Sequence, residues 1–376
     1  MLLAMTTWFS ASAVVPQLRA DWSLSASESA MLTIAVQLGF VAGALLSSLL
    51  TLADVLPPRR MMLVGAIGAA LANLLLLGVD SAALATPLRF LTGFFLAAVY
   101  PSGMKSMATW FRRGRGMALG VMVGALTLGS AAPHLVNGLG GLNWCTVVWT
   151  TSLLTVLGGV VAETMVSDGP FAFPRARFRP GQAVAVFRDR KVRLACYGYF
   201  GHMWELYAMW AWIVVFFSDL LDERGLGGEA VAPFIAFATI GIGAAGCVVG
   251  GVLADRRGRP WLTSVAMVAS GSASVLIGLI RNSPLGVVIT VALFWGFWVV
   301  ADSAQFSAMI TEVADQTYVG TALTLQLAIG FSLTVVTIWL VPLLQDELTW
   351  RWAFAVLVPG PALGTAAMRR LSSLMR

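Results

Sequence analysis

Charged side chains are scarce in this sequence. Only 11% of its 376 residues are Asp, Glu, Lys or Arg, whereas 58% are hydrophobic and the mean hydropathy is +0.83. A soluble domain of this length needs far more charge to cover its surface. A lipid bilayer removes that need, because apolar side chains can face its hydrocarbon core. The composition therefore excludes an ordinary soluble protein and indicates a membrane protein.

Groups that build metal, haem, nucleotide or catalytic sites are also sparse. The sequence has two histidines, and its three cysteines stand alone in apolar stretches without CxxC or CxxH spacing. It lacks a Walker-type phosphate loop, so we do not expect pumping driven by ATP. Its loops hold no catalytic triad and no paired carboxylates. We therefore expect no cofactor, no metal and no enzymatic activity.

Long apolar runs recur along the whole chain. Lipid offers the backbone no hydrogen bonds, so only helices and closed barrels span it, and the alternating segments typical of a barrel do not occur. Each run instead approaches the roughly 20 residues that a spanning helix needs. The sequence therefore predicts an all-α membrane protein with about twelve transmembrane helices, near 1–18, 31–52, 61–79, 84–107, 117–139, 144–165, 194–218, 231–254, 261–280, 285–309, 318–343 and 351–368.

Basic residues gather in alternate loops. If the chain starts in the cytoplasm, most of its 24 Lys and Arg residues fall on that same side of the membrane. The clusters lie in 59–60, 112–115, 175–193, 256–259 and 369–376. We therefore expect a multi-pass protein of the cell (inner) membrane with both termini in the cytoplasm. The basic surplus then reflects topology and anionic lipid, not binding to nucleic acid.

A polar, Arg-rich segment interrupts the apolar runs after the sixth of them. It covers 166–193 and is longer than any other loop. Equal numbers of predicted spans precede and follow it. We therefore expect an N-terminal six-helix bundle over 1–165, a cytoplasmic linker over 166–193 and a C-terminal six-helix bundle over 194–376.

The loops after the second and the eighth predicted spans are similar, as a parallel duplication of a six-span unit would explain. Their motif residues are Asp54, Arg59 and Arg60 in the first loop, and Gly251, Asp255, Arg256, Gly258 and Arg259 in the second. The second loop reads Gly-Val-Leu-Ala-Asp-Arg-Arg-Gly-Arg and resembles the Gly-x-Leu-Ala-Asp-Arg-x-Gly-Arg loop of the major facilitator superfamily (MFS). The first loop departs from that pattern, with Leu50 at the leading glycine and Pro57-Pro58 in the turn.

This resemblance covers essentially the whole chain, and Arg89-x-x-x-Gly93 is similar to a second MFS motif. It implies two pseudo-symmetric bundles in a monomer, which rock around a central site and expose it to each side in turn. It also implies that Asp255 and its arginines form a conformational latch against a neighbouring helix end. The alternative is a helix cap with a positive-inside anchor. The segment 8–13 is faintly similar to inorganic and organic anion carriers, and the fifth span lacks the antiporter run Gly-Pro-x-x-Gly-Gly.

Few ionisable residues lie inside the predicted spans. A charge at the centre of a spanning helix costs roughly 2.5–3.5 kcal/mol on insertion scales, so it usually faces a cavity or a partner. Arg89, His202 with Glu205, and Asp302 lie in spans four, seven and ten, which the resemblance places around the central cavity. His202 and Glu205 share one helical face, and such a pair could accept a proton from one side and release it to the other.

Further polar and aromatic residues complete the candidate site. Gln305 lies one turn after Asp302, and Tyr100 precedes Pro101, where a kink is expected. Arg89 could attract an anionic group of a substrate. An aromatic wall could form along the seventh span from Trp204, Tyr207 and Trp210. The alternative role for each of these residues is packing or hydrogen bonding between helices.

These features together predict a secondary active transporter of a small solute, coupled to protons through Glu205, with Asp302 as a second candidate group. Its partners would be that solute, protons and the lipid bilayer. One alternative is an uncoupled facilitator or an exchanger on the same fold, in which the buried charges serve packing only. Another is a non-transporting membrane receptor. The sequence does not identify the substrate or the direction of transport.

Overall fold

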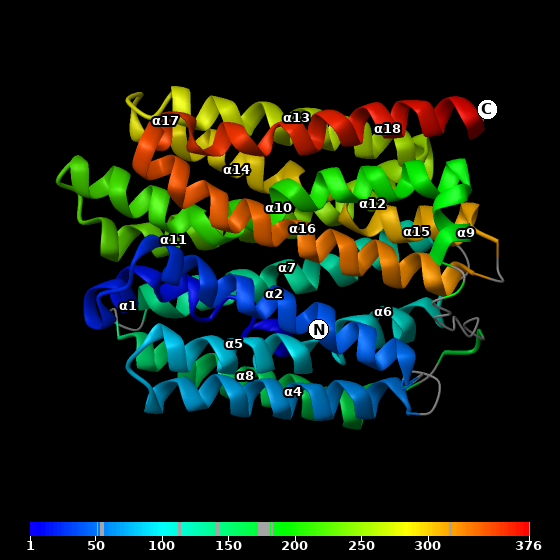
Figure 1. Cartoon of the computed structure of the whole chain (residues 1–376), viewed down its shortest axis with the longest axis horizontal. Coiled ribbons are helices and arrows are strands. Elements are labelled where there is room, and N and C mark those ends of the chain that lie inside the picture. The colour runs from blue at the N-terminus through cyan, green and yellow to red at the C-terminus, as the bar shows by residue number, and fades with distance from the viewer. Residues whose placement is uncertain are drawn as a thin grey trace.

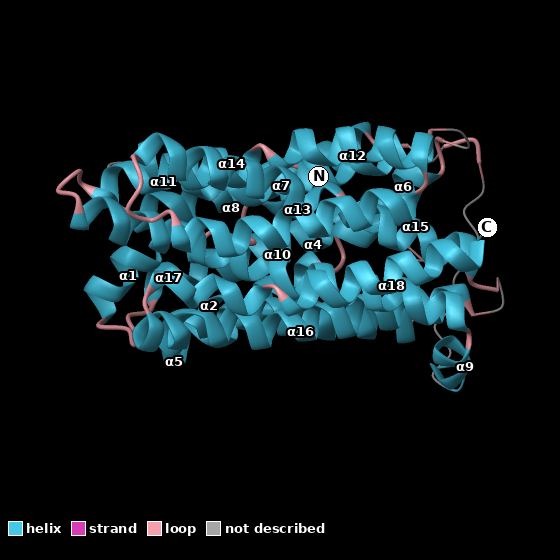
Figure 2. Cartoon of the chain, turned by 90° about the horizontal axis from the view of Figure 1, so that it is seen from above, coloured by secondary structure: helices cyan, strands magenta, loops and turns pink. Residues whose placement is uncertain are grey.

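The computed structural model consists of helices and loops in the residues that it describes, which are 1–50, 52, 56–111, 114–139, 143–167, 169–171, 181, 183–315 and 318–375. The helices run along the long axis of the molecule (Figure 1), and the view from above shows the same near-parallel arrangement (Figure 2). No strand occurs among these residues. The predicted all-α class is therefore confirmed, as expected for a backbone that must satisfy its own polar groups in lipid.

Ten helices in this part of the chain are long and apolar enough to cross a bilayer. Most are continuous, namely α2 (Ala26–Leu49), α4 (Pro58–Leu74) with the 3-10 turn η3 (Leu75–Gly78), α7 (Arg115–Leu139), α8 (Trp144–Met165), α10 (Arg190–Glu223), α13 (Arg259–Leu279) and α16 (Val319–Leu348). The others are interrupted, namely α5 (Ala82–Leu96) with α6 (Tyr100–Ala108), α11 (Gly228–Gly241) with α12 (Gly243–Arg257), and α14 (Leu285–Ala301) with α15 (Ser303–Val313).

The first and last predicted spans are not single long helices. Residues 1–18 form the 3-10 turns η1 (Leu3–Met5) and η2 (Ser12–Val14) and the start of α1 (Val15–Trp22). Near the other end of the sequence, α17 (Trp350–Ala353) and the 3-10 turn η5 (Phe354–Leu357) precede α18 (Pro359–Met375). Prolines stand at the start of α1 and of α18, where the missing N–H ends the preceding hydrogen-bond ladder. Ten spans are therefore shown, and the count of twelve stays a prediction.

Two of the helix breaks bring polar residues to the middle of the molecule. The α5–α6 break lies directly before Tyr100 and Pro101, where the sequence predicts a kink. Asp302 separates α14 from α15, so a carboxylate stands where the regular hydrogen bonds of the helix are interrupted. Irregular backbone at this depth is tolerated where protein or a cavity surrounds it. Both breaks therefore position residues for the site described below.

Close helix contacts join the first half of the sequence (1–165) to the second half (190–375). Helix α2 packs against α16, and α7 packs against α11 and α12. Small residues allow the α7–α12 approach, because a side chain at Gly251 would meet the Gly116 carbonyl carbon at 2.9 Å. The division into bundles at 166–193 stays a prediction, since residues 168, 172–180 and 182 lie outside the described part of the chain.

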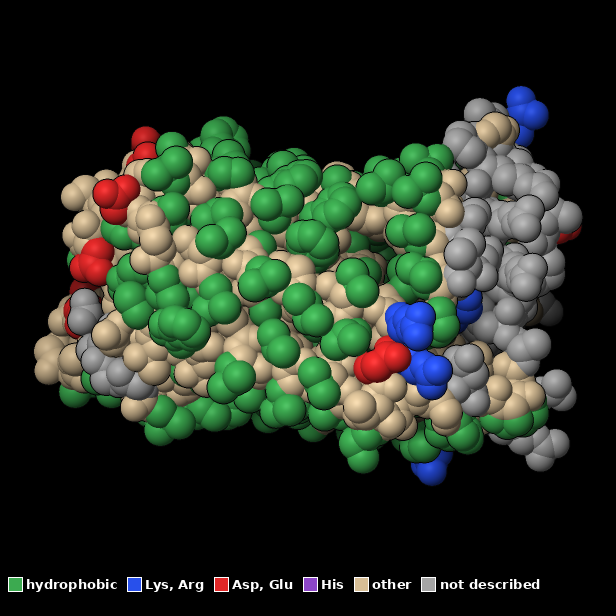
Figure 3. Space-filling view, turned by 90° about the horizontal axis from the view of Figure 1, so that it is seen from below, with side chains coloured by type: hydrophobic (Ala, Val, Ile, Leu, Met, Phe, Trp, Pro, Cys, Tyr) green, Lys and Arg blue, Asp and Glu red, His purple; other side chains and the backbone are tan. Residues whose placement is uncertain are grey.

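Apolar side chains dominate the lateral surface. Figure 3 shows them spread between one end with acidic side chains and the opposite end with basic ones. The acidic end, which we name the α1 end, includes Asp219, Asp222, Glu223 and Asp346. The opposite end, named after α9 (Ala183–Arg188), carries exposed Arg256, Arg257, Arg369 and Arg370. An apolar belt between polar ends is the surface that a bilayer requires.

Candidate functional site

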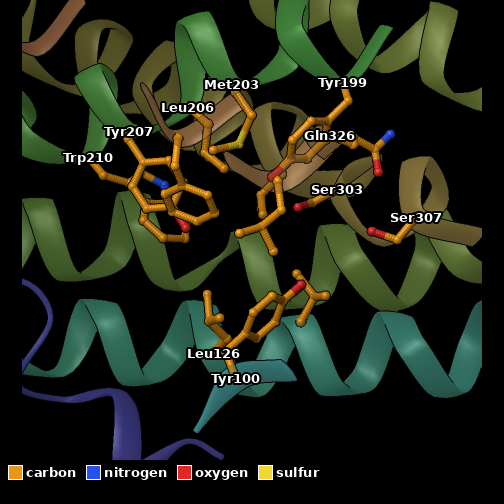
Figure 4. Close-up of a pocket in the computed structure, with 14 residues that line it drawn as sticks. Tyr100, Leu126, Tyr199, Met203, Leu206, Tyr207, Trp210, Ser303, Ser307 and Gln326 are labelled. Atoms are coloured by element: carbon orange, nitrogen blue, oxygen red, sulfur yellow. The ribbon is translucent and has the colours of Figure 1, made fainter. Parts of the chain in front are cut away.

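A narrow cavity lies in the centre of the molecule between helices from both halves of the sequence (Figure 4). Fourteen residues line it, and none of them is charged. Its water-accessible volume is about 30 Å³, which is room for roughly two water molecules. The polar members of its wall are Tyr100, Tyr199, Tyr207, Ser303, Ser307 and Gln326. The structure is therefore nearly occluded, with polar groups enclosed at its centre.

One face of α10 supplies much of the cavity wall. Tyr199, Met203, Leu206, Tyr207 and Trp210 recur at the spacing that places residues on one side of a helix. The predicted aromatic wall is therefore present in Tyr207 and Trp210. Trp204 lies off this face and donates its indole N–H to the Val356 carbonyl, 3.0 Å away. The helical period of α10 signals Tyr199 and Met203, which the sequence reasoning missed.

An aromatic cluster from both halves closes the cavity on one side. Trp8 packs its ring 4.9 Å from Phe40, 5.9 Å from Tyr207 and 5.7 Å from Phe331. Tyr207 in turn lies 5.1 Å from Phe331 and 5.6 Å from Trp210. Such tilted and edge-on contacts are favourable but carry no covalent or charged link. They can separate without leaving an unpaired charge.

His202 and Asp302 form a buried pair directly behind the cavity wall. Their Nδ1 and Oδ1 atoms lie 2.9 Å apart, and both side chains are 1% exposed. The approach is a close contact rather than a well-aligned hydrogen bond, because neither Asp302 oxygen has a hydrogen-bond partner among the described residues. Each member of the pair has a cavity-lining neighbour, because the Tyr199 ring lies 6.2 Å from the His202 ring in a tilted arrangement and Ser303 follows Asp302 in the chain. The pair therefore lies one residue behind the lining, next to Tyr199 and Ser303.

Glu205 has different partners from the predicted ones. Its carboxylate accepts hydrogen bonds from Ser270 Oγ and Trp295 Nε1, each at 2.7 Å, and the residue is 1% exposed. It projects from the side of α10 away from the cavity face, so it does not line the cavity. His202, which the sequence pairs with it, contacts Asp302 instead. Glu205 therefore joins α10 to α13 and α14 in the second half.

Arg89 is fully buried in the first half of the chain. Its guanidinium donates to a ring of neutral acceptors, which are the carbonyls of Thr7 (3.2 Å), Trp8 (2.5 Å) and Leu32 (3.3 Å) and the side chains of Ser10 and Asn73 (both 3.1 Å). The irregular turns between η1 and η2 leave carbonyls without helical partners, and arginine supplies the missing donors. Arg89 does not line the cavity. That Arg89 attracts an anionic group of a substrate stays a prediction.

The motif loop at Gly251–Arg259 touches the start of α7. The Asp255 carboxylate accepts a hydrogen bond from the Met117 backbone N–H at 3.3 Å, and Gly116 leaves room for it. A carboxylate at this helix N-terminus meets its positive dipole end. Gly258 has φ +92°, a conformation that favours glycine. Asp255 therefore bridges the two halves at the α9 end.

The other motif and site residues lie away from the cavity. Arg259 contacts Gln305 by a short hydrogen bond and Glu312 at 2.8 Å, so Gln305 belongs to the motif region. Arg256 is exposed beside it. In the first-half loop, Arg59 and Arg60 approach Glu163 at 3.9 and 3.8 Å. Asp54 lies outside the described residues.

Comparison with known proteins adds one finding. Residues 1–331 match the family model described as Major Facilitator Superfamily. No curated protein matches the chain. The matched region contains every residue that lines the central cavity, from Tyr100 to Phe331. It also contains the whole motif loop at Gly251–Arg259.

Proposed function

This chain belongs to the Major Facilitator Superfamily and is a membrane transporter, and from that premise we propose that it is a secondary active transporter working by alternating access. The observation that carries the proposal is the enclosed central cavity, which residues from both halves of the sequence line. A site of this kind near the middle of the membrane suits a substrate that is reached from each side in turn. The substrate is a small molecule, and the lipid bilayer surrounds the protein.

Two bundles, 1–165 and 194–376, would rock about this cavity on the linker 166–193. The interface between the halves supports this motion. Its central contacts are between aromatic rings, and toward the α9 end α2 and α16 meet through small hydroxyl side chains. Ser48 and Thr324, for example, place their hydroxyl oxygens 3.3 Å apart across α2 and α16. Such contacts can open without exposing buried charge. The basic clusters support assigning the α9 end and both termini to the cytoplasm of a cell (inner) membrane protein.

Asp255 would act as the latch that holds the cytoplasmic side closed. Its hydrogen bond to Met117 crosses from the second half to the first at the α9 end. Separation of α7 from α12 breaks this bond and removes the carboxylate from the helix N-terminus. The nearby contacts of Arg259 with Gln305 and Glu312 stay within the second half, so they would stabilise the loop rather than the closed state.

Protons would couple to transport through the buried acids Asp302 and Glu205, with His202 as the neighbour of Asp302. The His202–Asp302 contact behind the cavity supports this, because substrate in the cavity would alter the surroundings of both groups. An uncoupled facilitator or an exchanger is the second candidate. The two hydrogen bonds that satisfy Glu205, away from the cavity, favour a packing role for that residue.

Reconstituted vesicles with an imposed pH gradient test the coupling. Solutes that raise the melting temperature of the purified protein are first selected from sugars, amino acids, amides and organic ions. We expect a pH gradient, with either the inside or the outside acidic, to drive uptake of these solutes. Glu205→Gln should abolish this proton-driven uptake while sparing counterflow. The amide oxygen can still accept from the Trp295 indole N–H, and the amide nitrogen can donate to Ser270 Oγ, so the fold should persist.

Glu163→Gln serves as the matched control, because Glu163 approaches Arg59 and Arg60 and is not among the residues that line the cavity. This variant should keep proton-driven uptake. If uptake by the unmodified protein does not depend on the pH gradient, the protein is instead an uncoupled facilitator. A pH dependence unchanged by Glu205→Gln but removed by Asp302→Asn would assign the coupling to the His202–Asp302 pair alone.

A further inference from the structure

The central cavity presents buried hydrogen-bond donors that have no partner. The indole N–H of Trp210 and the amide nitrogen of Gln326 both lack a hydrogen bond among the described residues. These two side chains line the cavity and are 0% and 2% exposed. Buried polar groups in folded proteins are normally paired. An occupant of the cavity that satisfies both groups must therefore bring hydrogen-bond acceptors.

The two unpaired donors lie at opposite ends of the cavity. Figure 4 shows Trp210 beside Tyr207 at one end and Gln326 beside Ser303 at the other. The apolar side chains of Met203 and Leu206 lie between them (Figure 4). A molecule that reaches both donors therefore needs an acceptor at each end and an apolar middle.

The cavity offers no charge to neutralise an ion. No Lys, Arg, His, Asp or Glu is among its fourteen lining residues. The donors of Arg89 are taken up by carbonyls and by Ser10 and Asn73, and His202 and Asp302 face each other behind the wall. An anion would be buried without a cation, which is unfavourable. A cation would find aromatic faces but would leave the donors of Trp210 and Gln326 unpaired.

Aromatic rings give the cavity flat apolar walls. The Tyr207 ring lies 5.6 Å from the Trp210 ring and 5.1 Å from the Phe331 ring. Tyr100 lies beside Leu126, across the cavity from Tyr207 and Trp210 (Figure 4). Rings in such positions stack on flat ligands by offset or edge-on contact. Apolar walls with a few oriented polar groups are typical of small-molecule sites.

Building on the proposed transport function, we propose that the central cavity binds an uncharged, flat organic solute with a hydrogen-bond acceptor at each end. One acceptor takes the Trp210 indole N–H, and the other takes the Gln326 amide N–H. The aromatic rings cover the flat faces of the solute. The nearly occluded cavity has room for only a few water-sized atoms, so the bundles must separate slightly to admit this solute.

Matched triplets of flat heteroaromatic solutes test the charge and the acceptors together. Isonicotinamide is uncharged and has an acceptor at each end, isonicotinate is the anion on the same ring, and picolylamine is the cation. Further triplets built on other small heteroaromatic rings complete the panel. Binding to the detergent-purified full chain is measured by tryptophan fluorescence and by the shift in melting temperature. We expect carboxamides to bind at least about tenfold more tightly than their charged counterparts.

Two variants test the donors one at a time. Trp210→Phe and Gln326→Leu each remove a donor but keep most of the volume, and each should weaken carboxamide binding about tenfold, as expected for one lost hydrogen bond in a buried site. Trp339→Phe and Gln345→Leu are the controls, because neither residue lines the cavity. The melting temperature without ligand shows whether each variant folds. If one donor variant does not fold, the other alone tests the inference.

The outcomes separate this inference from the proposed function. Tighter binding of the anions or cations, equal binding across each triplet, or no binding of any member overturns the inference. Carboxamide binding that survives both donor variants also overturns it. Vesicle flux is measured independently. Flux of a charged solute leaves transport standing while rejecting this ligand class, whereas bound carboxamides that never cross the membrane reject transport and retain the site.

Discussion

Buried polar residues in this protein divide into those that stabilise helices and those beside the cavity. Arg89 belongs to the first group, because its donors satisfy carbonyls of the irregular first span. His202 and Asp302 belong to the second, since Tyr199 and Ser303 connect them to the cavity. The distinction matters because an intramembrane charge alone does not identify a substrate-binding residue.

Replacing Arg89 with methionine should destabilise the protein. The substitution removes the buried guanidinium N–H groups. The carbonyls of Thr7 and Trp8 and the side-chain oxygen of Asn73 then lose the hydrogen bonds that Arg89 donates. Hydrogen bonds from a charged group contribute about 1.5–3 kcal/mol each, so we expect the free energy of unfolding to fall by about 3 kcal/mol or more. Titration of the solubilised protein with sodium dodecyl sulfate measures this change.

Arg351→Met is the control for that prediction, because Arg351 is exposed and should tolerate the change. Arg89→Lys should not restore stability, since one ammonium group cannot reproduce the planar fork of donors. Normal stability of Arg89→Met combined with lost ligand binding would contradict the structural role. That result would return Arg89 to the binding site.

Helix ends and breaks are where the proposed motion of the two halves would be controlled. The start of α7 meets the end of α12 through Met117 and Asp255, and the breaks in α5–α6 and α14–α15 lie at the cavity. Continuous helices transmit a tilt along their length, whereas a broken helix can change angle locally. In the proposed mechanism, the α7–α12 contact is thus where one hydrogen bond would bias the opening of a whole side.

Asp255→Asn should favour opening at the α9 end. The amide keeps an acceptor for the Met117 N–H but loses the charge that interacts with the helix dipole, which is worth about 0.3–1 kcal/mol. Cysteine labelling at Ser307, which lines the cavity, should therefore become about 2- to 5-fold faster in a background without native cysteines. Glu347→Gln at the α1 end is the matched control, and an unchanged labelling rate in Asp255→Asn would remove the latch assignment.

The whole molecule presents an apolar lateral surface between oppositely charged ends. Acidic side chains mark the α1 end and basic side chains mark the α9 end (Figure 3). By the positive-inside rule, this asymmetry predicts that the α9 end faces the cytoplasm. This orientation would decide which side of the membrane the proposed Asp255 latch controls.

Single cysteines tested in right-side-out and inside-out vesicles establish that orientation. Cysteines at Arg256 and Arg370, both exposed near the α9 end, should react with an impermeant maleimide only from the cytoplasmic side. A cysteine at Leu226, in the exposed turn after α10, should react from the opposite side. Reaction of positions 256 and 370 from different sides would contradict the proposed topology of the second half.

The sequence by itself determined the class of this protein. Scarce charge and recurring apolar runs required a helical membrane protein, because lipid admits few alternatives. The Gly251–Arg259 motif indicated the family that the match over 1–331 then established. The kink before Pro101 also followed from local chemistry. These features depend on composition or on residues adjacent in the chain, so they can be predicted from the linear sequence.

Only the tertiary structure decided which buried groups meet. His202 contacts Asp302 rather than Glu205, Gln305 contacts Arg259 rather than the cavity, and the cavity includes Gln326 of α16. Such pairings depend on how each helix is rotated against its neighbours. Membrane helices are apolar on the lipid side and also against each other, so their hydrophobic pattern hardly reports that rotation. Packing of side chains from distant segments sets it instead.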